Sequence, residues 1–188
     1  MKKKICFLLD KDNNWLLSFC KKFLSLNKKK NINIFYNYKK IHNFDYVFVL
    51  GYTRILPNSF IKNNKLIIVI HESNLPKGKG NSPLQWQILK NKNHIDVNLI
   101  KLTENLDSGD IILTDRIVLN GTELYDEIRD KQAIVTFKLI SKFLKLKKIK
   151  FKKQVGKETF YKKRTPSDSE LKFTKSIKEN FNLLRISN

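Results

Sequence analysis

The sequence predicts an α/β fold, in which one domain holds a mostly parallel sheet flanked by helices. Two observations carry this prediction. Short apolar runs typical of strands alternate with segments that repeat apolar residues at the spacing of one helical face. The runs at residues 46–50 and 66–70 are continuous, which is typical of strands covered on both faces in a parallel sheet. At 188 residues, the chain has the size of a single domain.

The first half of the chain predicts four strands and two helices. Trp15, Leu16, Phe19, Phe23 and Leu24 repeat at helical spacing and indicate a helix after the first strand. Pro57 is suited to the first turn of a short second helix, because a proline costs no hydrogen bond there. The expected strands are residues 4–9, 31–36, 45–50 and 66–70.

The second half begins with a polar stretch, residues 72–82, in which prolines and glycines exclude regular structure. Ligands of open α/β sheets bind at the carboxyl ends of strands, so this loop is the expected position of a site. Thr122 is a suitable N-cap for a long helix. The further elements expected are a helix at 84–89, strands at 97–102 and 111–118, a helix at 122–146, and an extended tail from 154 with a helix at 176–184.

The predicted domain organisation is a core at residues 1–150 and a carboxyl-terminal extension at 151–188 that docks on it. The formal charge of +21 raises the alternative of a nucleic-acid-binding protein. Only five of the 38 basic residues are arginines, however, and the lysines are spread through every segment. We therefore expect the clusters at 28–30 and 145–153 to be solvated surface, with no specific nucleic-acid partner.

Cys6 and Cys20 lie in apolar surroundings without metal-ligand or disulfide spacing, which predicts two buried thiols in a reducing cytoplasm. The basic start of the chain resembles a signal peptide, but Asp10 ends its apolar run too early. No run approaches the ~18 apolar residues of a membrane span. We therefore expect a cytoplasmic protein with no membrane partner and no metal.

The residues with the clearest chemical potential are His71, at the end of the most apolar strand, and the acidic turn Asp107-Ser108-Gly109-Asp110. A histidine can donate or accept a proton near neutral pH. A carboxylate beside it could fix its tautomer or accept a proton from an amine. Both features also have structural explanations, since a histidine at a strand end is often hydrogen-bonded and Asp-Ser-Gly-Asp is an ordinary turn sequence.

The order of these motifs resembles the folate-dependent formyltransferases, which include methionyl-tRNA, glycinamide ribonucleotide and sugar N-formyltransferases. Residues 71–83, HESNLPKGKGNSP, are similar to the family loop His-x-Ser-x-Leu-Pro-x-x-x-Gly-x-x-Pro. Residues 107–111, DSGDI, are similar to the turn Asp-x-Gly-x-Ile that holds the family's catalytic aspartate. Residues 51–57 resemble the family segment before the central strand, and residues 161–169 with 182–185 resemble the carboxyl-terminal stretch of the sugar enzymes' core. The resemblance implies a Rossmann-like formyltransferase fold.

Three departures separate the chain from parts of this family. Val69 stands where the family motif Asn-x-His has asparagine. The loop after the first strand lacks the glycine-rich phosphate cradle of glycinamide ribonucleotide formyltransferases. At 188 residues, the chain is expected to lack the additional tRNA-binding domain of methionyl-tRNA formyltransferases. The resemblance is therefore strongest to small sugar N-formyltransferases.

The resemblance implies transfer of a formyl group from N10-formyltetrahydrofolate to the amine of an amino sugar, nucleotide-linked or a related precursor of surface glycans. His71 is the expected donor to the oxyanion, and Asp107 is expected to hold its ring or accept the amine proton. Arg164 is a candidate for a phosphate contact, although docking of the tail would also use it. The expected substrate- or folate-binding residues are Ser73, Asn74, Leu75, Pro76, Gly80, Trp15 and Tyr52.

Several alternatives remain open from the sequence. Turn formation explains Ser73 and Asn74 equally well, and core packing explains Trp15 and Tyr52. Asp110 is expected to be structural. The alternative functions are formyl transfer to glycinamide ribonucleotide or methionyl-tRNA, and a folate-binding relative that has lost transfer activity. A homodimer is one option for the oligomeric state.

Overall fold

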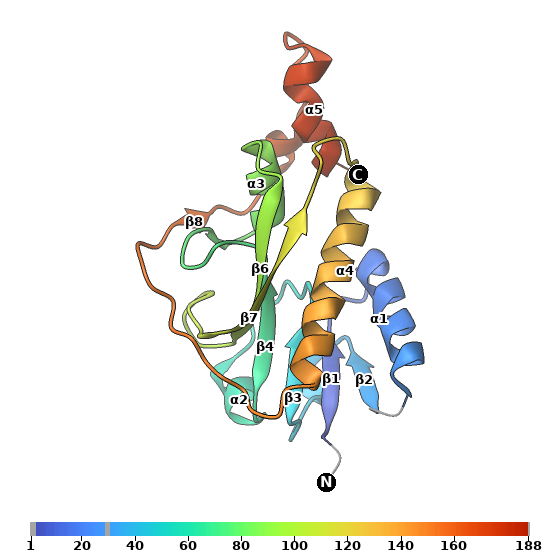
Figure 1. Ribbon diagram of the computed structural model, residues 1–188, viewed down its shortest axis with the longest axis vertical. Helices are drawn as coiled ribbons and strands as arrows, with labels where there is room; N and C mark the ends of the chain where they lie inside the picture. Colours follow the sequence, from blue (N-terminus) through green and yellow to red (C-terminus); the bar gives the residue numbers. More distant parts are fainter. Residues whose placement is uncertain (1–2, 29–30, 188) are drawn as a thin grey trace. The chain divides into compact units, whose positions relative to one another are not determined.

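A computed structural model describes residues 3–28 and 31–187, so most of the lysine cluster at 28–30 lies outside the described residues. Figure 1 shows the elements in chain order. The chain forms two compact units. The first comprises Met1–Ile70, Leu99–Ile112 and Lys148–Lys153, and the second comprises His71–Asn98, Leu113–Lys147 and Gln154–Asn188.

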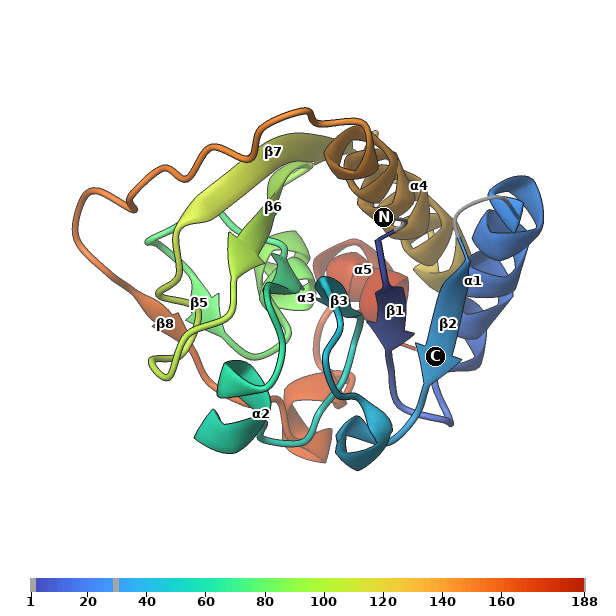
Figure 2. The ribbon, with the colours of Figure 1, turned by 90° about the horizontal axis from the view of Figure 1, so that it is seen from below.

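Six strands form one sheet in the order β2-β1-β3-β4-β6-β7. β1 pairs in parallel with both β2 and β3, which lie beside it in Figure 2, and β3 pairs in parallel with β4. The predicted α/β class with a mostly parallel sheet is confirmed. The strands are β1 (Ile5–Leu8), β2 (Ile32–Phe35), β3 (Tyr46–Val49), β4 (Ile67–His71), β6 (His94–Lys101) and β7 (Ile111–Val118).

The first unit contains α1 (Asn14–Leu26), α2 (Asn58–Lys62) and a short 3-10 helix, η2 (Tyr38–Lys40). α1 follows the predicted helical period and buries Leu16, Cys20 and Phe23. Pro57 occupies the N-cap of α2 and precedes the first turn that it was expected to join. An apolar cluster formed by the strands and α2 supports this unit; its buried members are Cys6, Leu8, Ile41, Val47, Val49, Phe60 and Ile67.

Cys6 and Cys20 are both free and buried, as the sequence predicted. Burial raises the pKa of the Cys6 thiol above its usual range and that of the Cys20 thiol to about 12. Such thiols remain protonated and are poor nucleophiles and metal ligands. They contribute to packing.

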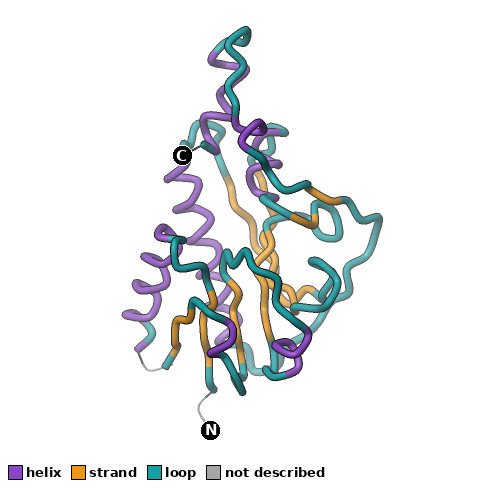
Figure 3. The backbone as a smooth tube through the Cα atoms, turned by 180° about the vertical axis from the view of Figure 1, so that it is seen from behind, coloured by secondary structure: helices purple, strands orange, loops and turns teal. Residues whose placement is uncertain are grey.

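The second unit contains the long helix α4 (Tyr125–Leu144) and the shorter helices α3 (Pro83–Leu89) and α5 (Ile177–Ile186). Two short strands, β5 (Lys79–Gly80) and β8 (Phe160–Tyr161), pair in parallel, and η3 (Pro166–Ser169) follows. α5 packs against α3 and α4 (Figure 1). Figure 3 distinguishes these helices and strands from the loops that join them. The predicted boundary between a core and an extension at residue 150 stays a prediction.

The prediction of Thr122 as the N-cap of the long helix was wrong. Thr122 donates from both its backbone N–H and its hydroxyl to Asn120 Oδ1, at 2.8 Å each. The helix begins later, and its N-cap residue is Leu124, whose N–H is bonded by the Glu127 carboxylate at 2.9 Å. A local bond to Asn120 therefore competes successfully with capping.

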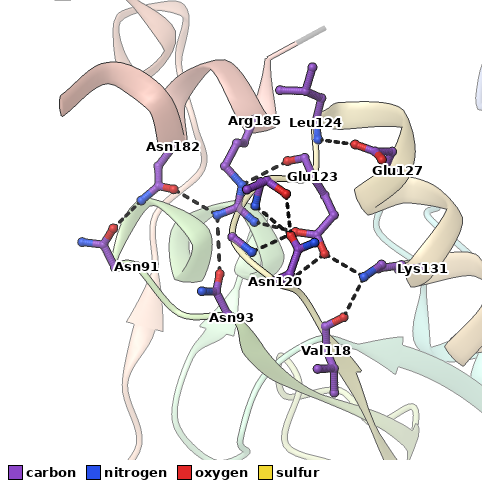
Figure 4. Close-up of polar contacts among 12 residues, drawn as sticks. Asn91, Asn93, Val118, Asn120, Glu123, Leu124, Glu127, Lys131, Asn182 and Arg185 are labelled. Atoms are coloured by element: carbon purple, nitrogen blue, oxygen red, sulfur yellow. Dashed lines mark hydrogen bonds and ion pairs between the residues drawn. The ribbon is translucent and has the colours of Figure 1, made fainter. Parts of the chain in front are cut away.

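A buried ion pair fixes α5 to the loop before α4 (Figure 4). Arg185, 1% exposed, donates from Nε to the Glu123 carbonyl at 3.0 Å and from Nη2 to the Glu123 carboxylate at 3.2 Å. Lys131 Nζ approaches the same carboxylate at 2.7 Å. Asn182 accepts from Arg185 Nη1 at 3.0 Å and donates to Asn91 at 2.6 Å. Polar contacts with residues that are distant in sequence therefore fix the position of α5.

Among the described residues, no helix combines the length and apolar character needed to cross a membrane.

Candidate functional site

His71 is the last residue of β4 and opens the second unit. Its side chain is only 4% exposed, and its Nε2 lies 2.8 Å from the carbonyl oxygen of Gly78. A carbonyl only accepts, so Nε2 carries the proton of this bond, and the lone pair of a neutral ring is then on Nδ1. The loop that follows β4 therefore folds back and orients the imidazole.

Ser73 lies two residues further and is 1% exposed. Its carbonyl accepts from Asn98 Nδ2 at 2.6 Å, and Asn98 Oδ1 accepts from Thr114 Oγ1 at 2.6 Å. The Ser73 hydroxyl is buried and has no hydrogen-bond partner in the described structure. Because an unsatisfied buried hydroxyl costs free energy, it is a candidate contact for a polar ligand atom.

Only glycine fits at position 78, because a side chain there would be too close to its neighbours. The φ of Gly78 is +74°, and a Cβ there would lie 2.7 Å from the Tyr161 ring and 3.1 Å from Ser73 Cβ. Its N–H donates to Thr159 Oγ1 at 2.8 Å. The carbonyl that orients His71 is thus positioned by the strand pair β5–β8 and by the tail of the chain.

Three more side-chain contacts hold this loop. The side chain of Lys79, 1% exposed, pairs with Glu158 at 2.5 Å. Gln87 Nε2 donates to the Glu72 carbonyl at 2.7 Å, and Gln132 Nε2 donates to the Glu72 carboxylate at 2.6 Å. Residues from α3, α4 and the tail therefore fix the loop on both sides of Ser73.

Asp107 belongs to the first unit, in a tight turn before β7. Its φ of +48° is a left-handed conformation that aspartate and asparagine tolerate better than most residues. Gly109 is obligatory here, since a Cβ would collide with the carbonyl of Lys101. Asp110 pairs with Lys153 at 3.1 Å, and its carbonyl accepts from the Lys101 N–H at 3.0 Å. The turn presents Asp107 as a half-buried carboxylate.

The other predicted residues divide between the two units. Leu75 and Pro76 are buried in the His71 loop, Gly80 forms part of β5, and Asn74 is exposed. In the first unit, Trp15 lies in the first turn of α1. Tyr52 and Val69 pack against the apolar cluster, and the Tyr52 hydroxyl is buried without a partner in the described structure. The roles assigned to these residues stay predictions.

Sequence reasoning missed Asn98, Gln87, Gln132 and Lys79 as supports of the His71 loop. Asn98 carried one usable signal, because it is a polar residue flanked by the apolar residues Val97 and Leu99 in a predicted strand. Such a buried amide must find hydrogen-bond partners. The others lie on segments whose contacts are set by tertiary structure alone. Within the described ranges, no group of three histidines, cysteines or carboxylates could hold a metal ion.

Residues 14–144 match the family model described as formyl transferase. The methionyl-tRNA formyltransferase of Prochlorococcus marinus is 31% identical over 116 residues, which cover 61% of this chain and 35% of that protein. The same enzyme of Thermodesulfovibrio yellowstonii is 29% identical over 162 residues, 84% of this chain and 52% of that protein. The chain thus spans between a third and about half of these relatives' length.

Three solved structures share the fold. Methionyl-tRNA formyltransferase from Clostridium thermocellum has a TM-score of 0.83 at 23% identity, and the match covers 97% of this chain and 82% of that protein. HypX from Aquifex aeolicus in complex with tetrahydrofolic acid has a TM-score of 0.76 at 15% identity, and the match covers 100% of this chain and 35% of HypX. A 4-N formyltransferase from Francisella tularensis has a TM-score of 0.67 at 20% identity, and the match covers 99% of this chain and 88% of that protein.

Proposed function

This chain belongs to the formyl transferase family, and we propose that it transfers a formyl group from N10-formyltetrahydrofolate to the amine of an amino sugar. The observation that carries the proposal is the His71 loop. It places an oriented imidazole two residues from a buried hydroxyl that has no partner in the described structure. Both groups can form hydrogen bonds with a carbonyl-type oxygen.

In this proposal, the acceptor amine attacks the formyl carbon, the bond between that carbon and N10 breaks, and N10 takes up a proton from water as tetrahydrofolate leaves. The negative charge that develops on the formyl oxygen is stabilised by aimed donors, each of which is worth about 3–4 kcal/mol in comparable sites. The Ser73 hydroxyl is one donor in the loop. His71 is the second candidate donor, through the Nε2 proton that it shares with the Gly78 carbonyl.

Asp107 is proposed to take the proton that the attacking amine loses. A carboxylate in a half-buried turn is suited to this role, whether it acts directly or through water. The His71 loop is proposed to contact the folate. Trp15 and Tyr52 stay candidates for stacking. A structural neighbour that binds tetrahydrofolic acid supports a folate as the formyl donor.

Methionyl-tRNA is the second candidate acceptor. The sequence relatives reported above both carry that name, and so does the solved structure with a TM-score of 0.83. The amino-sugar acceptor is supported by the likeness of residues 161–169 to the sugar enzymes and by the fold shared with the 4-N formyltransferase.

Mass spectrometry can separate these acceptors. The protein would be incubated with N10-formyltetrahydrofolate and, in parallel, with a panel of nucleotide-linked amino sugars and with methionyl-tRNA. The proposal predicts a formylated amino sugar. Formylation of methionyl-tRNA alone would assign the second candidate, and folate binding without any formylated product would indicate a relative that has lost transfer activity.

A further inference from the structure

Residues 158–161 of the tail run along the loop that follows His71, and both segments belong to the second unit. The tail strand β8 pairs in parallel with β5, beside which it lies in Figure 2. The two strands approach so closely that a Cβ on Gly80 would collide with the carbonyl oxygen of Tyr161. The tail is therefore in direct contact with the loop that orients His71.

Thr159 makes three hydrogen bonds to this loop. Its hydroxyl oxygen accepts from the Gly78 N–H at 2.8 Å, its carbonyl accepts from the Lys79 N–H at 2.9 Å, and its N–H donates to the Pro76 carbonyl at 3.4 Å. Gly78 and Lys79 are buried, so their N–H groups need partners within the protein. Thr159 supplies the acceptor for both of these donors.

The Lys79 N–H and the Gly78 carbonyl belong to one peptide group. The N–H of this group donates to the Thr159 carbonyl, and its oxygen accepts from His71 Nε2 at 2.8 Å. Hydrogen bonds in such a chain polarise one another, so the bond to Thr159 makes the Gly78 carbonyl a better acceptor. The Thr159 hydroxyl holds the N–H of the same glycine. Thr159 therefore fixes the group that orients the imidazole.

We propose that Thr159 is a positioning residue for His71, and that it acts through Gly78 to keep the proton of the neutral imidazole on Nε2. The hydrogen bonds of a histidine ring decide which of its two nitrogens carries the proton. The match to the family model ends at residue 144, so this contribution comes from outside the matched segment. Its catalytic consequence rests on the proposed function, in which Nε2 donates to the oxyanion. The tautomer itself does not.

Nitrogen-15 NMR of the histidine side chains tests the tautomer without folate or acceptor. The chain has three histidines, and the exposed His42 and His94 serve as internal references. At alkaline pH, wild-type His71 should carry its proton on Nε2. Thr159→Val keeps the shape of the side chain but leaves the Gly78 N–H without its acceptor, so both tautomers should appear. Thr159→Ser keeps the hydroxyl and should restore the wild-type spectrum.

The rate of formyl transfer is the second measurement. Thr159→Val should lower kcat by about tenfold, as the loss of one hydrogen bond can, and Thr159→Ser should recover most of it. Thr159 is exposed, so these substitutions leave the buried core intact. Thr165→Val is the matched control, because it makes the same change in the tail at a hydroxyl that bonds Asp168 at 2.9 Å. It should alter neither the His71 spectrum nor kcat.

A wild-type His71 tautomer in Thr159→Val would overturn the proposal, even if the free energy of unfolding fell, because Thr159 would then have a structural role only. Equal disturbance of the tautomer in Thr159→Ser or Thr165→Val would also overturn it, since the effect would not depend on this hydroxyl. A tautomer that depends on the Thr159 hydroxyl, in a protein that transfers no formyl group, would retain this inference and remove the proposed function.

Discussion

Asn98 fixes the backbone of Ser73, the residue whose buried hydroxyl lies in the His71 loop. The amide Nδ2 of Asn98 donates to the Ser73 carbonyl at 2.6 Å, while its Oδ1 accepts from Thr114 at 2.6 Å. One side chain that is 2% exposed thus joins the loop to β6 and β7. In the proposed site, Asn98 is a positioning residue that contacts no substrate.

Asn98→Ala should destabilise the protein by about 1–3 kcal/mol, because it leaves the carbonyl of the buried Ser73 without its hydrogen-bond donor. Urea unfolding followed by circular dichroism measures the change. Asn105→Ala, which alters an exposed residue, should change the free energy of unfolding by less than about 0.5 kcal/mol. A loss at Asn98 as small as that of the control would show that the bridge contributes little.

The strands and the first helix were predictable because their signals are local. β1, β3 and β4 each carry an apolar run long enough to identify them, and α1 carries a clear helical period. The start of α4 was not predictable from capping preference, because Asn120 bonds Thr122 first. The pair β5–β8 was missed because each strand has only two residues, and their pairing depends on the tail.

In the candidate site too, residues with a local sequence signal were predictable, and residues that depend on distant contacts were not. His71 and Asp107 could be identified from motif and order, since each stands beside a strand whose pattern is clear. Their supports could not. Gly78 is bonded by Thr159, Lys79 by Glu158 and Glu72 by Gln132, and these partners lie about 60 to 80 residues away along the chain. Contacts of this kind leave no periodic signal in the sequence.

Glu123 should make stability depend on pH in acid. Burial alone would raise the pKa of its carboxyl group, but hydrogen bonds from Lys131 and from the N–H groups of Asn120 and Gly121 lower it to about 2. Because the folded pKa lies below the unfolded value of about 4.3, this stabilisation is complete above that value and is lost as pH falls toward 2.

Glu123→Gln should therefore cost about 3 kcal/mol or more near pH 7, where it also leaves Arg185 buried without its carboxylate. The difference in unfolding free energy between wild type and variant should shrink as pH falls from about 4.3 toward 2. Urea titrations at several pH values measure it. A difference that does not change with pH would mean that the ionised carboxylate is not what stabilises α5.

Asp107→Asn should fold normally and lose at least about two orders of magnitude in formyl transfer, since general-base assistance contributes 10²–10⁴-fold. Asparagine tolerates the left-handed φ of +48°, so the turn is preserved while the charge is removed. Asp110→Asn is the matched control, as it changes a carboxylate that pairs with Lys153. Turnover near that of wild type in Asp107→Asn would refute the role of proton acceptor.

Val69 tests whether the site functions without the family's asparagine. If His71 and Ser73 stabilise the oxyanion, His71→Asn should nearly abolish transfer. Val69→Asn should change transfer little, or reduce it by burying an amide without partners. The measurement is kcat for each variant. An increase of about a hundredfold in Val69→Asn, close to the 3–4 kcal/mol of one aimed donor, would instead indicate that the native protein is an impaired relative.

Transfer of an isotopically labelled formyl group is the most direct test of the central claim. Wild-type protein would be mixed with labelled N10-formyltetrahydrofolate and the acceptor found in the panel, and the label on the acceptor amine would be followed by mass spectrometry within a single turnover. Our account predicts rapid labelling by wild-type protein and almost none by Asp107→Asn. An unlabelled acceptor with wild-type protein, under conditions where the folate is bound, would contradict it.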